Sequence, residues 1–375
     1  MKYMLIAGEA SGDLHASRVI AALRRRDTHA SFIFLGGDLM AAQAGVKPMV
    51  HYRDMAYMGF SEVLRNLGKI KQNLGTAKRL LRLSSPDALI LIDYPSFNLK
   101  VAAEAKRLGI PVFYFISPKV WAWKEWRVRT LKKLVTKMFV IFPFEVDYYR
   151  TRHEWDVQYV GNPSVDEIDE ALAAAGTRDE FLKRHRLRDR QIVALLPGSR
   201  LGEIKNNLPV MQAAVMQFPQ YRGVVAGAPG VDADFYSRFT DLPVVTGETM
   251  ELLKHSRAAL VTSGTATLET ALAGVPQVAC YRSNGSKVAY NLMKRVLSVD
   301  YVTLPNLIAD SEIIPEMLLH MCTPDAVAEK LAPLLREGEA RQRMLDDYAA
   351  MRARLGTADA ADGVAKAIVE HLGAQ

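Results

Sequence analysis

Asp93 is the residue whose type and position most clearly suggest chemistry. It directly follows the apolar run 88–92, which has the length of a buried strand, and Pro95 comes two residues later. A carboxylate at the carboxyl end of a strand suits a general base, and partial desolvation raises its pKa toward a useful range. The competing interpretation is an Asx turn that prepares Pro95, which is a common use of aspartate.

Residues 8–13, with the sequence Gly-Glu-Ala-Ser-Gly-Asp, follow another apolar run near the start of the chain. They combine two glycines, a hydroxyl and two acids at the end of an expected strand. We expect Glu9, Ser11 and Gly12 to bind a substrate there. The alternative is a capping turn for a helix that begins near Leu14.

Two loops in the second half of the chain suit a diphosphate. The run 192–196 leads into Pro197, Gly198, Ser199 and Arg200, where glycine permits close approach of the backbone and arginine can bind phosphate through two N–H groups. The run 258–262 leads into residues 263–269, whose small side chains open a helix with unpaired amides that attract anions. The expected contacts with this anion are those of Gly198, Ser199, Arg200, Ser263, Gly264, Thr265 and Ala266.

Glu269 lies one turn into the same expected helix, where its carboxylate could bind ribose hydroxyls. Each loop also has a plain structural interpretation: a strand-to-helix turn at 197–200, a helix cap at Ser263 and a solvated helix residue at Glu269. Neither G-x-G-x-x-G after residues 3–7 nor a P-loop motif occurs. The lone acid pair Asp232 and Asp234 fits a helix start better than a metal site, so we expect no metal and no cofactor.

Aromatic residues follow two further apolar runs. Residues 118–123 read Pro-Lys-Val-Trp-Ala-Trp, and residues 142–145 read Phe-Pro-Phe-Glu. Tryptophan usually packs against a domain face, so these segments favour a structural role over a functional one.

Residues 55–83 carry six Lys or Arg against one acid, Glu62, with apolar residues at helical spacing. A basic helix with an apolar stripe can lie on an anionic bilayer surface. On spacing alone the favoured alternative is a stripe that faces the core, and a lipid substrate would reverse that preference. The expected membrane contacts are Leu64, Leu67, Lys69, Lys71, Lys78 and Arg79.

The elements that must position these residues alternate along the chain. Short apolar runs are expected as buried strands, with amphipathic segments such as 16–25 and 101–108 between some of them. The pattern predicts two Rossmann-like halves joined near residues 160–190, with a cleft between them and ligands beyond the carboxyl ends of the strands. The expected strands are 3–7, 31–35, 88–92, 112–116, 138–142, 192–196, 222–226, 244–245, 258–262 and 277–280.

The 375 residues suffice for two domains, expected at 1–163 and 164–350 with a helical tail at 351–375. Two cysteines are too few for a disulfide framework, which favours the cytoplasm. No apolar stretch has the length of a secretory or membrane-spanning segment. The net charge of +7 favours an acidic partner, such as nucleic acid, an anionic lipid surface or a phosphorylated substrate.

The motifs at 8–13, 93–98, 117–123, 142–145, 196–200, 263–269 and 305–307 resemble those of the lipid-A-disaccharide synthase family, in the family's order and over roughly residues 1 to 320. The resemblance implies a GT-B α/β fold and an inverting hexosyltransferase. The donor would be UDP-2,3-diacylglucosamine and the acceptor 2,3-diacylglucosamine 1-phosphate, known as lipid X. The products would be the β-1,6-linked disaccharide 1-phosphate and UDP.

By the same resemblance, Asp93, Arg200 and Asn306 match positions important for activity, and Asn306 would contact uridine or diphosphate. It also implies a homodimer with exchanged C-terminal segments, at the inner face of the cytoplasmic membrane. Three positions depart from the family pattern: Lys119 stands where glutamine is common, Ser96 where an acid is common and Asn162 where histidine is frequent.

Three alternatives stay open on sequence grounds. One is another GT-B enzyme, such as a UDP-N-acetylglucosamine 2-epimerase or a cell-wall glycosyltransferase. Another is a non-catalytic protein that binds anionic lipid through residues 55–83. The third, a nucleic-acid protein, is disfavoured because no binding motif occurs and Lys and Arg are spread along the chain.

Overall fold

The computed structural model describes residues 1–55, 66–122, 124–282 and 301–373. The chain divides into two compact units, which are treated separately below. Unit 1 comprises Met1–Pro163 with Thr357–Gln375, and unit 2 comprises Ser164–Gly356. Residues 351–355, expected in the C-terminal tail, form the last turn of a helix in unit 2 instead.

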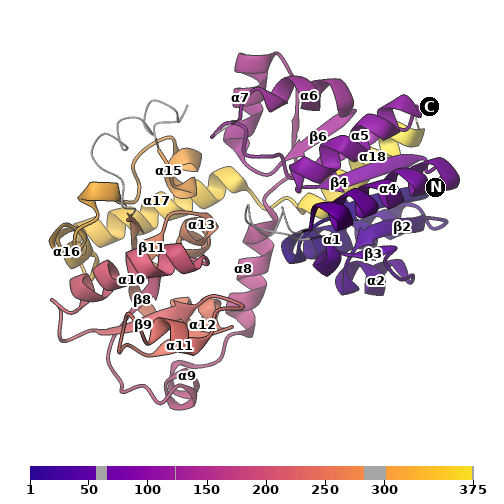
Figure 1. The fold of residues 1–375 in the computed structure, drawn as a ribbon. Coiled ribbons are helices and arrows are strands. Elements are labelled where there is room, and N and C mark those ends of the chain that lie inside the picture. The colour runs from indigo at the N-terminus through magenta and orange to yellow at the C-terminus, as the bar shows by residue number, and fades with distance from the viewer. Residues whose placement is uncertain (56–65, 123, 283–300, 374–375) are drawn as a thin grey trace. The chain divides into compact units, whose positions relative to one another are not determined.

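Unit 1 is built on a parallel sheet whose seven described strands follow the order β3-β2-β1-β4-β5-β6-β7 (Figure 1). The central strand β4 reads Ala-Leu-Ile-Leu-Ile and is buried along its whole length, as a strand covered on both faces must be. The strands are β1 (Lys2–Ala7), β2 (Ser31–Gly36), β3 (Val50–His51), β4 (Ala88–Ile92), β5 (Val112–Phe115), β6 (Lys137–Val140) and β7 (Gln158–Tyr159).

Helices cover both faces of this sheet. Alternate residues of β4 point to opposite cores: Ile90 packs with α1 and α18, and Leu91 packs with α4, α5 and α6. The helices of unit 1 are α1 (Ala10–Arg26), α2 (Asp38–Ala44), η1 (Tyr52–Asp54), α4 (Leu67–Ser84), α5 (Pro95–Arg107), α6 (Arg127–Leu134), α7 (Pro143–His153) and α18 (Ala360–Gly373).

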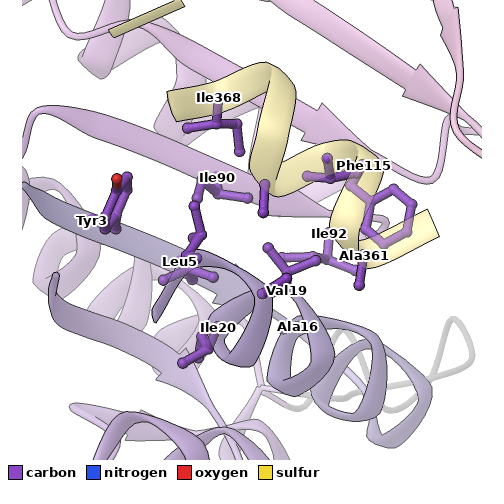
Figure 2. Packing of buried hydrophobic residues seen from close by; sticks show 14 of the residues in the cluster. Tyr3, Leu5, Ala16, Val19, Ile20, Ile90, Ile92, Phe115, Ala361 and Ile368 are labelled. Atoms are coloured by element: carbon purple, nitrogen blue, oxygen red, sulfur yellow. The ribbon is translucent and has the colours of Figure 1, made fainter. Parts of the chain in front are cut away.

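The last helix, α18, belongs to unit 1 although the chain reaches it from unit 2. Figure 2 shows Ala361 and Ile368 of α18 beside Ile90, Ile92 and Phe115 of the sheet. At the surface, Arg26 of α1 forms an ion pair of 2.5 Å with Asp362 of α18. The C-terminal segment therefore completes the apolar cover of one sheet face within the same chain.

Unit 2 repeats the architecture with a second parallel sheet, of order β10-β9-β8-β11-β12-β13 in its described part. Its central strands β8 and β11 are apolar and buried. The strands are β8 (Ile192–Leu196), β9 (Arg222–Gly227), β10 (Val244–Thr246), β11 (Ser256–Thr262), β12 (Gln277–Tyr281) and β13 (Glu316–Leu318). The helices are α8 (Pro163–Ala174), α9 (Arg178–Arg184), α10 (Leu201–Val215), α11 (Ala233–Tyr236), α12 (Thr249–Lys254), α13 (Thr265–Leu272), α15 (Leu304–Ala309), η2 (Leu319–Met321), α16 (Pro324–Leu331), η3 (Ala332–Leu334) and α17 (Glu339–Leu355).

Every strand expected from the sequence is present, and no bound differs from the expected one by more than two residues. Three short edge strands were not predicted: β3, β7 and β13. Each has two or three residues, which is too short for an alternating or apolar pattern to be recognised. The helical tail expected at 351–375 is interrupted at residues 356–359, between α17 (Glu339–Leu355) and α18.

We expect Ile368→Ala to destabilise unit 1. Ile368 is fully buried in the core that α18 shares with the sheet, and an Ile→Ala change in a core costs about 2–5 kcal/mol. All four tryptophans lie within residues 121–155, so tryptophan fluorescence during urea unfolding reports unit 1 selectively. The matched control is Lys366→Ala on the same helix, whose side chain is 61% exposed. Equal midpoints for the two variants would show that α18 does not stabilise unit 1.

Candidate active site

The Asp93 turn lies at the carboxyl end of β4 and has an unusual backbone. Asp93 and Tyr94 both adopt left-handed conformations, with φ of 43° and 48°. For residues other than glycine, such a conformation costs on the order of 1–3 kcal/mol each and persists only where surrounding contacts impose it. Those contacts are present: the Tyr114 hydroxyl and the Asn98 amide donate to the Asp93 carbonyl at 2.5 and 2.7 Å.

Three further contacts fix the same turn. The Asp93 amide donates to the Phe115 carbonyl at 3.0 Å, which ties the end of β4 to the end of β5. The Tyr94 hydroxyl donates to the Met55 carbonyl at 2.7 Å, and the Tyr94 ring lies over Gly8. A Cβ on Gly8 would come within 2.4 Å of that ring, so this position requires glycine. The ends of β1, β4 and β5 are therefore locked together around Asp93.

Asp93 is exposed at the carboxyl end of the central strand β4, yet the surrounding protein desolvates its carboxylate and raises its pKa. The Tyr94 amide and the charges of Lys119 and His15 oppose that rise. Glu9 lies near enough that burial and the Asp93 charge together raise the Glu9 pKa. The edge thus presents a carboxylate that binds a proton more readily than an ordinary aspartate does.

The 8–13 loop contributes less surface than the sequence suggested. Ser11 is exposed in the first turn of α1. Gly12 is buried against Ala7 and Ile92, so it offers little surface, and its contact with a substrate stays a prediction. Asp13 is a structural residue, because its carboxylate accepts hydrogen bonds from the backbone amides of Gly37, Leu39 and Met40 at the start of α2.

The 197–200 loop of unit 2 presents Arg200 to solvent. Gly198 has φ of 107°, and a Cβ there would lie 2.6 Å from the Glu203 carboxylate, so only glycine fits. Glu203 accepts hydrogen bonds from the Ser199 and Arg200 amides at 3.2 and 3.3 Å, and it pairs with the Arg200 guanidinium at 3.1 Å. The Arg200 side chain is 76% exposed, which leaves most of its N–H groups open to a ligand.

The start of α13 lies beside this loop, because β8 and β11 are neighbours in register from Ile192 to Leu196. Gly264 and Thr265 are exposed, and the first amides of a helix have no acceptor within the helix. Ser263 and Ala266 are half-buried, and the Ser263 hydroxyl donates to the Val302 carbonyl at 3.4 Å. The arrangement can receive an anion between a guanidinium and backbone amides.

Glu269 is half-buried one turn into α13. Burial and the nearby Glu167 carboxylate raise its pKa. A half-buried carboxylate can accept hydrogen bonds from hydroxyl groups, which is the chemistry expected of a ribose contact.

Asn306 does not have the predicted geometry. Its side chain is fully buried, its amide group donates to the Ile314 carbonyl and to Glu316 at 3.0 Å, and its oxygen accepts from the Ile313 and Ile314 amides at 2.9 Å. These bonds occupy both ends of the amide. The expectation of direct contact with uridine or diphosphate is therefore corrected: Asn306 holds the segment that leads into β13.

Asn207 is a residue that the sequence analysis missed. It is fully buried in α10, and its amide donates to the Thr262 hydroxyl at 2.9 Å and the Pro197 carbonyl at 3.4 Å. Its oxygen accepts from the Arg282 amide at 2.7 Å. One side chain thus joins the ends of β8, β11 and β12. The only signal in the sequence is a polar residue within an apolar helical pattern.

A cavity of about 400 Å³ lies at the carboxyl ends of β9 and β10, and the sequence analysis did not predict it. Gly227 ends β9 and packs closely against β10, whereas Gly247, directly after β10, has open space where a side chain would stand. The lining residues are Ala171, Ala174, Ala175, Gly227, Pro229, Gly247, Glu248, Thr249, Met250 and Glu251.

The basic segment is only partly a free surface. Leu64 and Trp123 lie outside the described residues. Ala77 and Leu81 of α4 pack into the core, so the apolar stripe faces inward over this half of the helix. Lys69 forms an ion pair of 2.7 Å with Asp54. Leu67, Lys71 and Arg79 are exposed, and Lys78 is half-buried.

The described ranges contain neither a membrane-spanning helix nor a cluster of metal ligands. Within residues 1–55, 66–122, 124–282 and 301–373, no helix combines the length and apolarity that crossing a membrane requires. Over the same part of the chain, no three His, Cys, Asp or Glu side chains are grouped as metal ligands would be.

Some of the solved structures with this fold hold UDP or a UDP-sugar. A structure of S. aureus MnaA with UDP aligns with a TM-score of 0.68 and 12% identity, covering 99% of this chain and 95% of that one. The Neisseria meningitidis UDP-GlcNAc 2-epimerase bound to UDP-GlcNAc aligns with a TM-score of 0.64 and 13% identity over the full length of both chains. At such identities the similarity establishes the GT-B fold alone.

Sequence relatives are more specific. The family model described as lipid-A-disaccharide synthetase matches residues 3–368. The lipid-A-disaccharide synthase of Myxococcus xanthus is 39% identical, covering 99% of this chain and 97% of its own length. That of Geobacter metallireducens is 36% identical with the same coverage. This chain therefore belongs to the lipid-A-disaccharide synthetase family.

Proposed function

We propose that this chain carries out the reaction that its family membership implies: a 2,3-diacylglucosamine passes from its UDP carrier to the 6-hydroxyl of lipid X, with inversion and release of UDP. The epimerase and non-catalytic alternatives are not favoured.

We propose that Asp93 is the general base. The supporting observation is the carboxylate itself, exposed at the end of β4 on a turn fixed by Tyr114, Asn98 and Phe115, with a raised pKa. It would accept the proton of the acceptor hydroxyl as that oxygen attacks the anomeric carbon. Glu9 and Ser11, on the neighbouring strand end, would contact the acceptor sugar.

We propose that unit 2 binds the donor. Arg200 and the amides at Ser263–Ala266 would stabilise the charge that develops on the diphosphate, without a metal ion. Glu269 would bind the ribose. The cavity beside β9 and β10 is on the same edge of the sheet and fits a nucleoside base, so we assign uracil to it. Closure over the donor would limit its hydrolysis by water.

We propose that unit 1 binds an anionic membrane surface through the outer face of α4, α5 and α6, and that the enzyme is peripheral on the cytoplasmic side. These helices carry five, three and four Lys or Arg and a single acid, Glu104, which Arg82 and Arg107 already pair. Leu83 at 76% and Trp126 at 67% are the most exposed large apolar residues on this layer. Cations interleaved with apolar side chains suit an anionic bilayer.

Two partner assignments complete the proposal. No nucleic-acid partner is proposed, because the sequence carries no recognised nucleic-acid-binding motif and Lys and Arg are spread along the chain. A homodimer is proposed from the family resemblance. Its C-terminal exchange has a concrete form here, since α18 is the segment that one chain would place in the other.

Asp93→Asn should lower kcat by about 10²–10⁴-fold, because the carboxamide cannot accept the proton. UDP affinity, measured by calorimetry, should stay unchanged, since Asp93 is in unit 1. The control is Asp87→Asn at the opposite end of the same strand, where the carboxylate only accepts a hydrogen bond from the Lys2 amide. Near-normal turnover in Asp93→Asn would remove this residue from the role of base.

Arg200→Ala should weaken UDP binding by about 10–10²-fold, as expected for a lost hydrogen bond to a charged group, and should lower kcat as well. Lys205→Ala is the matched control, because Lys205 is an exposed cation on the same helix α10. Calorimetry that gave equal UDP affinities for wild type and Arg200→Ala would exclude a diphosphate contact.

The double variant Arg79→Glu/Lys133→Glu should bind vesicles that contain phosphatidylglycerol at least about tenfold more weakly, because each cation near such a surface contributes about 1 kcal/mol. Neutral phosphatidylcholine vesicles provide the baseline. The control Lys47→Glu/Lys366→Glu makes the same charge change elsewhere on unit 1, near α2 and on α18. If both double variants lost binding equally, net charge rather than this face would be responsible.

A further inference from the structure

Helix α7 holds the loop after β5 at three points. The Tyr149 and Ser117 hydroxyls share a hydrogen bond of 2.6 Å, and the Tyr148 hydroxyl donates to the Val120 carbonyl at 3.4 Å. The Glu145 carboxylate accepts from the Trp121 indole N–H at 3.2 Å. The donors and acceptors on the helix lie on one side of α7, so a single helix fixes residues 117–121.

Glu145 also binds the loop after β6. Its second oxygen accepts from the Ile141 and Phe142 amides at 3.2 and 3.1 Å. The side chain is 1% exposed, and a buried carboxylate is costly unless hydrogen bonds satisfy it. Burial raises the Glu145 pKa to about 7, against the opposing effects of these bonds and of the Lys119 charge.

The ionisable neighbours of Glu145 come from its own helix α7, from the loop after β5 and from β7. Lys119 of the held loop favours its ionised form. Tyr149, one turn later in α7, and Tyr159 of β7 lie close enough that the Glu145 charge contributes to their raised pKa values. Above about pH 7 the carboxylate is ionised and can accept all three N–H groups.

The loop after β5, residues 117–121, carries one charged side chain, that of Lys119. The loop leaves β5 through Ile116, whose φ of 66° is strained for a β-branched residue, and Trp121 is buried edge-on against Phe144. Lys119 is exposed between these anchors, and within the described ranges its ammonium forms no hydrogen bond or ion pair. Its charge nevertheless acts on Asp93, at the end of the neighbouring strand.

We propose that Lys119 binds the phosphate of the acceptor and that Glu145 is the positioning residue that holds Lys119 for this contact. The proposal rests on Asp93 as the base. The acceptor carries its reacting hydroxyl and its phosphate on one sugar ring, so a cation close to the base can engage the phosphate. The loop carries a cation that has no ion-pair partner in the described part of the chain and whose charge acts on Asp93, and a lysine is a strong point-charge partner for phosphate.

The test compares acceptors with and without the 1-phosphate at pH 8, where Glu145 is ionised in the wild type. Lys119→Met should raise the KM for lipid X by about 10–10²-fold, the loss expected for a charge-assisted hydrogen bond, and should abolish the preference over 2,3-diacylglucosamine without phosphate. Lys119→Arg, which keeps the charge, should restore most of that preference. Donor KM and UDP affinity should not change.

Glu145→Gln should raise the KM for lipid X in the same direction, because the amide nitrogen of glutamine cannot accept from Ile141 and Phe142. In the Lys119→Met background it should have little further effect on this KM, since the group that it positions is absent. The matched control is Thr151→Ala, on the same helix, where the hydroxyl donates only to the Asp147 carbonyl. Trp121→Phe removes one N–H and keeps the aromatic packing, and it should resemble Glu145→Gln.

Three results would overturn the proposal. One is an unchanged acceptor preference in Lys119→Met, and a second is a raised donor KM or UDP dissociation constant in that variant. The third is additive effects of Glu145→Gln and Lys119→Met on the KM for lipid X, which would leave Glu145 with a purely structural role. The Asp93→Asn variant distinguishes a failure of this inference from a failure of the base assignment. If Asp93→Asn remains active, Asp93 is not the base. If Asp93→Asn is inactive but Lys119→Met behaves as the wild type, only the role of Lys119 and Glu145 is excluded.

Discussion

The pair of left-handed residues at the end of β4 is the constraint on which our account of unit 1 depends. Asp93 and Tyr94 adopt left-handed conformations that residues other than glycine avoid. Tyr114 and Asn98 hold them there through hydrogen bonds to the Asp93 carbonyl. Because the backbone is fixed, the carboxylate has a defined place at the sheet edge. The glycine at position 8 belongs to the same arrangement, since any side chain there would collide with Tyr94.

In unit 2, a buried side-chain amide holds the loops at the carboxyl ends of the strands. Asn207 binds the ends of three neighbouring strands, and Gly198 lets the loop after β8 close onto Glu203. Both sheets therefore hold their carboxyl-end loops by polar side chains buried beneath them. This arrangement gives rigid positions to exposed groups, here a carboxylate in one unit and a guanidinium with helix amides in the other, and preorganised charge is what transfer to a sugar requires.

Much of the fold could be predicted from the sequence, because parallel strands that are buried on both faces consist of short runs of apolar residues. The position of Asp93, Arg200 and the start of α13 at strand ends followed from those runs and the general geometry of such sheets. The short edge strands could not be predicted, since two or three residues carry no periodicity.

The sequence does not show which residues of a motif are exposed and which hold other segments in place. Asn306 and Gly12 look like ligand contacts in a motif, but one is saturated by its own loop and the other is covered by β1 and β4. Asn207 and Glu145 act through hydrogen bonds to segments whose proximity only the tertiary fold reveals. A motif therefore located the loops correctly, while the division into exposed and supporting residues required the structure.

The central claim is that the fold keeps the Asp93 carboxylate partly desolvated and ready to accept a proton. The most direct measurement is the titration of that carboxyl group by 13C NMR, with protein labelled at aspartate side chains and the Asp93→Asn variant used to assign the signal. Our account predicts a pKa above the ordinary value of 3.8. A value at or below 3.8 would contradict it, because such a carboxylate would be fully solvated or paired and too weak a base for this role.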